Sequence, residues 1–250
     1  MASAATSQAT LPAGAAVRRR AVRQRASRDD LVVGGLTALL VVWLTVTVAL
    51  PLGVLLVKSV QNARGEFVGL ANYARYFATP SLVSSLWNSL CVSTLATAIV
   101  VPLAFAYAYC LQRTAMRAKP LFLSAALLPI FAPSLLPAIS FIYIFGNQGF
   151  LKSWLMGGEI YGPIGIVLSQ VFYCFPHAVL ILSAALSLAD QRLYEAAAAM
   201  GTSARRTFLT VTLPGVKFGV ISASFVIFTL VITDFGIAKV IGGQFSVLAT

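Results

Sequence analysis

The sequence is poor in charged residues. Asp, Glu, Lys and Arg together make up 10% of the 250 residues, whereas hydrophobic residues make up 59%. A soluble domain usually carries about 25% charged residues, because its surface must be hydrated. The composition therefore excludes an ordinary water-soluble domain and indicates a membrane protein.

The sequence also lacks the residue sets on which most enzymes depend. It has one histidine, His177, so no second imidazole is available to share a zinc ion, and its three cysteines show no CxxC spacing. The nucleotide-binding pattern GxGxxG, the phosphate-binding pattern GxxxxGK and the nucleophile pattern GxSxG are absent. We therefore expect no catalytic residue, no metal and no cofactor, and we expect any ATP to be hydrolysed by a partner subunit.

Long hydrophobic runs are what the sequence does contain. Crossing about 30 Å of hydrocarbon takes about 20 helical residues, and the backbone must satisfy its own hydrogen bonds there. None of the runs alternates as a barrel strand does. We predict an all-α membrane protein, a polytopic helix bundle whose membrane domain covers residues 31–250. The five predicted spans cover approximately residues 31–57, 86–111, 121–145, 164–188 and 219–237.

The cations are distributed unevenly between the two ends of these spans. Thirteen of the 18 Lys and Arg residues lie before the first span, after the second or after the fourth, and five lie on the opposite side. The positive-inside rule then places the N-terminus and residues 190–215 in the cytoplasm and the C-terminus outside. Orientation in the membrane accounts for the net charge of +11, so we expect no nucleic-acid partner.

Residues 1–30 are rich in Ala, Ser, Gln and Arg and have no apolar periodicity. This composition predicts a disordered basic cytoplasmic tail that is attracted to anionic membrane lipid. A cleaved signal peptide is the competing interpretation. The apolar run after Asp30 is about 27 residues long, against 7 to 15 for the apolar region of a signal, which favours an uncleaved first span.

A polar segment between the fourth and fifth spans predicts two short helices. Asp190 can cap the first, and Gly201 can end it in the left-handed conformation. Apolar side chains at helical spacing form a stripe on this helix: Leu193, Ala196, Ala197 and Met200.

Thr202 or Ser203 can cap the second helix, which we expect to end at Pro214. Its predicted apolar face consists of Ala204, Phe208 and Val211. The small alanines of the first helix would let a partner approach closely, with Glu195, Arg205 and Arg206 at the rim. An amphipathic hairpin lying on the bilayer is the other interpretation.

The polar segment resembles the EAA signature of the permease subunits of binding-protein-dependent ABC importers. The matching residues are Glu195, Ala196, Ala197, Gly201, Leu213 and Pro214, with Val211 where that family usually has Ile. The resemblance implies that residues 190–215 form a coupling loop that docks on a cytoplasmic ABC ATPase dimer. We assign coupling to Glu195, Ala196, Ala197, Gly201, Arg205, Leu213 and Pro214.

The same resemblance implies further partners and a location. The partners are a periplasmic or extracellular substrate-binding protein and a second permease half, fused or separate. The location is the bacterial inner membrane, which the chain would cross several times.

Two further stretches resemble a particular subfamily. Residues 65–88 are similar to permeases with two homologous halves in one chain, which import ferric iron, thiamine or phosphonates, and residues 232–250 are similar to 2-aminoethylphosphonate permeases. The resemblance implies a phosphonate substrate, with ferric iron or thiamine as alternatives. The chain has one EAA pattern where a fused permease has two, so we expect it to be the N-terminal half of a longer permease.

The substrate path is less clearly marked. Pro129, Pro133 and Pro137 recur every four residues, which predicts one helical face with freed carbonyls along a translocation path. A simple kink for packing is the alternative. Asp234 is the only carboxylate within a predicted span, and gating and solvation at the outer surface both stay open.

Two other classes of function fit the sequence less well. A transporter driven by an ion gradient would need several ionisable residues at mid-membrane, and only Asp234 approaches this. A membrane-embedded enzyme would need a clustered nucleophile, which the sequence lacks.

Overall fold

The computed structural model describes residues 28–250, and all regular elements among them are helices, as predicted. The predicted basic tail lies almost entirely outside the described residues. The chain divides into two compact units, residues 1–72 and 73–250, and each is described by itself. Four of the described helices are long and apolar enough to cross a membrane, or five if one bent pair counts as a span.

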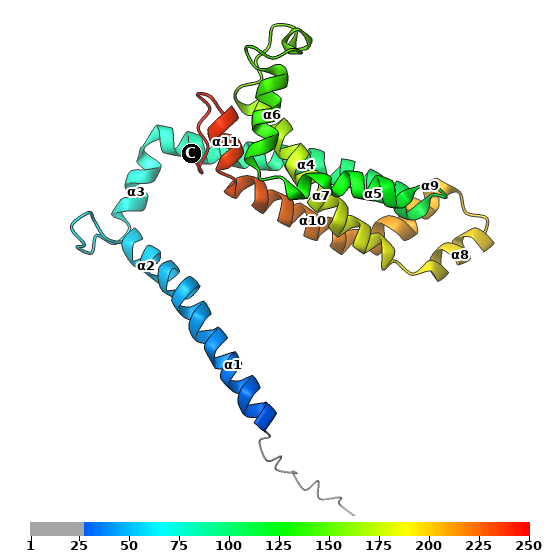
Figure 1. The fold of residues 1–250 in the computed structure, drawn as a ribbon, viewed down its shortest axis with the longest axis horizontal. Helices are drawn as coiled ribbons and strands as arrows, with labels where there is room; N and C mark the ends of the chain where they lie inside the picture. The colour runs from blue at the N-terminus through cyan, green and yellow to red at the C-terminus, as the bar shows by residue number, and fades with distance from the viewer. Residues whose placement is uncertain (1–27) are drawn as a thin grey trace, which may run out of the picture. The chain divides into compact units, whose positions relative to one another are not determined.

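In the first unit, one helical stretch of 32 residues coincides with the first predicted span. It consists of α1 (Arg28–Leu44), a π-helical turn η1 (Thr45–Ala49) and α2 (Leu50–Ser59) (Figure 1). Its hydrophobic side chains are exposed all round, and the hydroxyl groups of Thr37, Thr45 and Thr47 donate to carbonyls four residues back. These three hydroxyl groups are thus satisfied within the helix, as a lipid environment requires.

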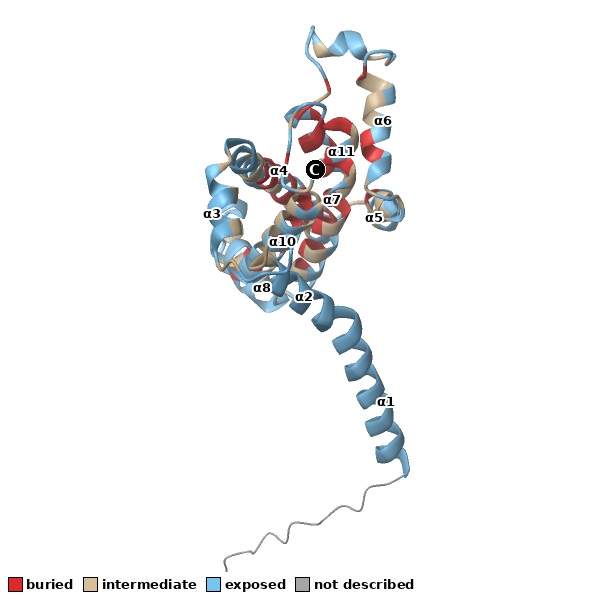
Figure 2. Cartoon of the chain, turned by 90° about the vertical axis from the view of Figure 1, so that its left-hand side faces the viewer, coloured by how far each residue is buried: buried red, intermediate tan, exposed pale blue. Residues whose placement is uncertain are grey.

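The second unit is built on three long helices packed side by side: α4 (Pro80–Arg113), α7 (Pro163–Ser187) and α10 (Leu213–Thr233) (Figures 1 and 2). Small side chains at their contacts are fully buried, among them Ala96, Ala178 and Ala223. Gly219 lies so close to Ala185 that an added Cβ would collide with it. Small residues let helix backbones approach closely, and dispersion contacts then hold the bundle together.

Residues 65–88, between the first two predicted spans, contain a short helix α3 (Ala71–Ala78) and the first turns of α4. Pro80 lies in the first turn of α4, where its missing N–H costs nothing.

The third predicted span is not one helix. It consists of α5 (Lys119–Leu127), a 3-10 turn η2 (Leu128–Phe131) and α6 (Leu135–Phe145), bent by 99° at an elbow formed by residues 128–134. The three prolines therefore do not share one helical face, and that prediction is wrong. Ala132 is extended, with ψ of 136°, because the ring of the following Pro133 disfavours the helical region.

The fifth predicted span, at residues 219–237, begins earlier and ends sooner. A continuous helical stretch runs from Ala204 to Thr233 through α9 (Ala204–Thr207), a π-helical turn η4 (Phe208–Thr212) and α10. Pro214 does not end a helix. In the π turn the Leu213 amide donates to the Phe208 carbonyl, five residues back, and this wider turn leaves room for the proline ring.

The remaining helices are α8 (Gln191–Ala199), the 3-10 turn η3 (Lys152–Leu155) and α11 (Gly236–Ile241). Asp234 lies in the break between α10 and α11 and not inside a helix, which corrects its predicted place within a span.

Candidate functional site

The hairpin of α8 and α9 has the caps that the sequence predicted. The Asp190 carboxylate accepts a hydrogen bond of 2.9 Å from the Arg192 amide, and the Ser203 hydroxyl accepts one of 3.4 Å from the Arg206 amide. Of the two predicted caps for the second helix, Ser203 is therefore the one used. Both caps satisfy amides that have no partner within their own helix.

Gly201 makes the turn between the two helices. Its φ is +65°, and no atom lies within 4 Å of the place where a Cβ would be, so the position requires glycine for its conformation and not for lack of space. The Thr202 amide donates to the Ala197 carbonyl and the Gly201 amide to the Ala198 carbonyl, which together form a Schellman motif. The left-handed cap is confirmed.

The side chain of Thr202 closes the hairpin further. Its hydroxyl donates to the Ala197 carbonyl at 2.8 Å and lies 2.9 Å from the Thr207 hydroxyl. The turn is thus held by contacts within six residues of Gly201.

The predicted apolar stripe of α8 is divided between two faces. Ala197 is buried at 4% exposure, while Leu193 and Met200 are 54% and 73% exposed. Ala197 is thus turned inward in the free chain, and its role in coupling stays a prediction. The other predicted coupling residues are exposed: Glu195, Ala196, Gly201, Arg205, Leu213 and Pro214.

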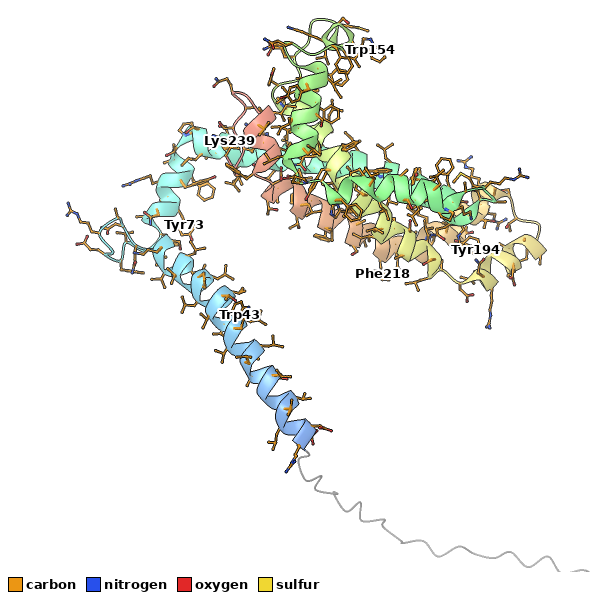
Figure 3. All side chains as sticks on the ribbon, viewed as in Figure 1. Trp43, Tyr73, Trp154, Tyr194, Phe218 and Lys239 are labelled. Carbon is orange, nitrogen blue, oxygen red and sulfur yellow. The ribbon has the colours of Figure 1, made fainter. Side chains whose placement is uncertain are left out.

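The inner side of α8 carries an aromatic contact that sequence reasoning missed. Tyr194 lies on α8 at the far end of the bundle (Figure 3). The guanidinium carbon of Arg113, at the end of α4, lies 3.9 Å from the centroid of the Tyr194 ring. The Tyr194 hydroxyl donates to the Thr212 hydroxyl at 3.1 Å. In the sequence Arg113 is one of the thirteen cations on the predicted cytoplasmic side, and its place just after a predicted span is the signal that could have found it.

The residues predicted for the translocation path fall into two separate places. Pro129 and Pro137 line an apolar pocket of about 370 Å³ together with Leu136, Phe141 and Phe172. Pro133 does not line this pocket, and neither does Asp234. The elbow thus shapes an apolar cavity on one side of α6.

Asp234 instead fixes α11 against α7. One carboxylate oxygen accepts hydrogen bonds from the Gln170 amide group at 3.0 Å and from the Ile237 backbone amide at 2.9 Å. Gln170 is buried at 1% exposure in the second turn of α7. This pair of bonds caps α11 and ties it to the bundle.

The break held by Asp234 lies next to the elbow of the third span. A Cβ added at Gly236, the first residue of α11, would lie 3.0 Å from the Ser134 hydroxyl and 3.1 Å from the Leu135 side chain. Gly236, two residues after Asp234, thus packs closely against Ser134 and Leu135, although about 100 residues separate them in the sequence.

Among residues 28–250, no three side chains of His, Cys, Asp or Glu come together as a metal site would require. His177 is half-buried, and one ring nitrogen lies 3.3 Å from the Tyr173 carbonyl.

Residues 36–250 match the family model described as the binding-protein-dependent transport system inner membrane component. Because the match covers most of the chain, the protein belongs to this family of membrane permeases. It is the permease subunit of an ABC importer, as the EAA resemblance implied.

Individual relatives agree with this class. The chain is 26% identical over 210 residues to a probable sulfate transport permease of Nephroselmis olivacea, covering 83% of this chain and 72% of the relative. It is 27% identical over 219 residues to the spermidine/putrescine permease PotB of Haemophilus influenzae, covering 82% and 76%. It is also 27% identical to the thiamine permease ThiP of Brucella abortus, covering 76% of this chain and 36% of that protein.

The fold has a solved counterpart. A bacterial ABC transporter that imports alginate matches with a TM-score of 0.68 and 15% identity, over 82% of this chain and 74% of the other. At this identity the likeness shows the fold alone.

Proposed function

We propose that this permease is driven by a cytoplasmic ATPase dimer that grips residues 190–215. The observation that carries the proposal is the α8–α9 hairpin, a rigid polar projection at the end of an apolar bundle, with Glu195, Ala196 and Arg205 exposed on it. Its Schellman turn and two caps make it stiff enough to transmit a push. Cations near it favour a cytoplasmic position, with the N-terminus inside and the C-terminus outside.

In this mechanism the permease alternates between two states. ATP closes the two ATPase subunits, each holding one coupling hairpin, and their approach opens the path to the outside. A binding protein delivers substrate there, and ATP hydrolysis restores the inward-facing state. A second permease half supplies the other hairpin.

We place the translocation path for the substrate beside the elbow between α5 and α6. The pocket lined by Pro129 and Pro137 lies on one side of α6, and α11 with Asp234 packs against the start of the same helix. Irregular backbone inside a membrane domain is tolerated only where protein or a hydrated cavity covers it. Movement of α11 would therefore change the shape of this region.

For the substrate we propose a phosphonate such as 2-aminoethylphosphonate, with ferric iron or thiamine as the second candidate. This rests on the resemblance of residues 65–88 and 232–250 to the fused two-half permeases. The relatives named for sulfate, polyamines and thiamine support a small charged solute. Uptake of labelled 2-aminoethylphosphonate by a deletion strain carrying this permease tests the choice, and uptake of ferric iron alone would refute it.

The test of ATPase docking uses Gly201. Replacing it with Val forces a β-branched residue to φ of +65°, whereas Asn accepts that conformation at small cost. We expect Gly201→Val to lose co-purification of the ATPase subunit and uptake, and Gly201→Asn to keep both. Gly215→Ala is the control, because Gly215 is equally open but has an ordinary helical φ. ATPase binding unchanged in Gly201→Val would refute the docking role.

A further inference from the structure

Arg113 joins three elements with one side chain. It is the last residue of α4, and its Nη2 donates to the Leu186 carbonyl at 3.0 Å, near the end of α7. Its Nη1 donates to the Gln191 side chain at 3.4 Å, in the first turn of α8. The flat face of the same guanidinium covers the Tyr194 ring, also on α8, at 3.9 Å.

These contacts need the shape of an arginine. The last carbonyls of α7 have no partner within the helix and carry the negative end of its dipole, so a cation is favoured there. Arg can donate in its plane and stack through its face at the same time, which Lys cannot. The Nε of Arg113 is buried without a hydrogen-bond partner among the described residues, and the residue as a whole is half-buried, so this guanidinium is partly shielded from solvent.

Tyr194 extends the connection to α10. Its hydroxyl donates to Thr212, which is fully buried in the π turn η4 immediately before α10. The ring of Tyr194 therefore touches α4 through Arg113 on its face and α10 through Thr212 at its tip. Apart from Tyr194 and Ala197, the residues of α8 are exposed.

We propose that Arg113 and Tyr194 form a clamp that passes movement of α8, the first helix of the hairpin, to the ends of α4 and α10. The inference rests on the proposed function, because the force on the hairpin comes from the ATPase subunit. The contact between Tyr194 and Arg113 moves α4, and we call it the Arg113 arm. The hydrogen bond between Tyr194 and Thr212 moves the π turn that leads into α10, and we call it the Thr212 arm. Arg113 and Tyr194 are thus positioning residues for coupling and do not touch the transported solute.

Hydrogen exchange of the full chain, purified in detergent with its ATPase subunit, tests the clamp without knowledge of the substrate. Three peptides report on it: residues 191–200 on α8, residues 108–113 on α4 and residues 208–213 before α10. In the unaltered complex we expect Mg-ATP to change exchange in all three. Arg113→Lys should raise exchange of residues 191–200 without nucleotide at least fivefold and abolish the ATP response of α4.

Two variants of Tyr194 separate the arms of the clamp. Tyr194→Phe keeps the ring over Arg113 and loses the bond to Thr212, so the ATP response should persist in α4 and disappear before α10. Tyr194→Leu removes both contacts and should lose both responses. Arg117→Lys is the matched control, because Arg117 is an exposed cation four residues further along the chain, and it should behave as the unaltered protein does.

The outcomes distinguish the clamp from the docking proposal. ATPase co-purification that is retained in all variants, together with the selective losses above, supports the clamp. Exchange in Arg113→Lys and Tyr194→Leu equal to that of the unaltered complex would overturn it while docking stands. Loss of ATPase binding in Arg113→Lys would also overturn it, since the residue would then only shape the docking surface. If the unaltered chain binds no ATPase, the proposed function itself fails, and the clamp as a transmitting device fails with it.

Discussion

The turn between α8 and α9 and the elbow between α5 and α6 both interrupt helices, but the contacts that hold them come from different distances along the chain. At the turn, the Asp190 and Ser203 caps, the conformation of Gly201 and the Thr202 bonds all lie within residues 190–207. The elbow starts from Pro133, which pushes Ala132 out of the helical region, but it is packed against α11 from the end of the chain.

The difference separates two kinds of break. A turn whose hydrogen bonds all come from residues nearby in the sequence keeps its geometry without support from the rest of the protein. It can therefore project from the bundle and stay rigid. An elbow whose angle depends on a distant helix changes when that helix moves. The first kind suits a docking element and the second suits a movable part of a path.

The largest effect that would test this comparison is expected from Asp234→Ala. The change removes the acceptor for two hydrogen bonds and leaves the buried Gln170 amide unpaired, which should cost about 2 kcal/mol of unfolding free energy and release α11 from the elbow. Thermal unfolding in detergent and uptake measure it.

Asp234→Asn is the matched control, because its amide oxygen can accept the same two bonds. It should lose well under half as much stability and keep uptake. If Asp234→Asn abolishes uptake as Asp234→Ala does, the negative charge itself is required. That result would favour a gating role for Asp234 over a role in holding α11 in place.

A somewhat smaller effect is expected from Gly236→Val. Its side chain must push into Ser134 and Leu135, which lie 3.0 to 3.1 Å from the Cβ position, at a cost of about 1 to 2 kcal/mol. The distance between spin labels on α5 and α6 should change, because the elbow loses its support. Unchanged label distances would mean that the prolines alone set the angle.

At the hairpin the effects should be smaller and should stay local. Asp190→Ala removes a cap and should cost about 1 kcal/mol, seen as roughly fivefold faster amide exchange in residues 191–200 with no change around the elbow. Asp190→Asn should restore most of the protection. Faster exchange at the elbow in Asp190→Ala would contradict the separation of the two breaks.

The smallest effect is expected from Ser203→Ala. The bond from the Arg206 amide is 3.4 Å long, so its loss should cost less than about 1 kcal/mol, and exchange in residues 204–207 should rise less than in the Asp190 variant. An effect larger than that of Asp190→Ala would show that the second helix carries more of the hairpin's stability than the geometry indicates.

Sequence reasoning was successful where a signal acts over a few residues. Gly201 was assigned a left-handed cap and Asp190 an N-cap, and both were correct, because a positive φ and an orphan amide are local requirements. It was wrong at Pro214, where a π turn accommodates the ring. It did not foresee the burial of Ala197, because that burial depends on which way α8 faces. It passed over Arg113, since no local pattern connects the end of α4 with Tyr194, 81 residues later.

The sequence by itself determined that this protein is a helical membrane protein of the permease family and that two short helices lie between the last two long ones. A hydrophobic run long enough to span the bilayer must form a helix there, because its backbone has to satisfy its own hydrogen bonds. Capping residues and a glycine at fixed spacing likewise determine where a short helix begins and ends. Only the tertiary structure decided the 99° elbow, the tie of Asp234 to Gln170 and the stacking of Arg113 on Tyr194. These contacts join residues about 60 to 100 positions apart, and which side chains meet is settled only when α4, α7 and α10 have packed together.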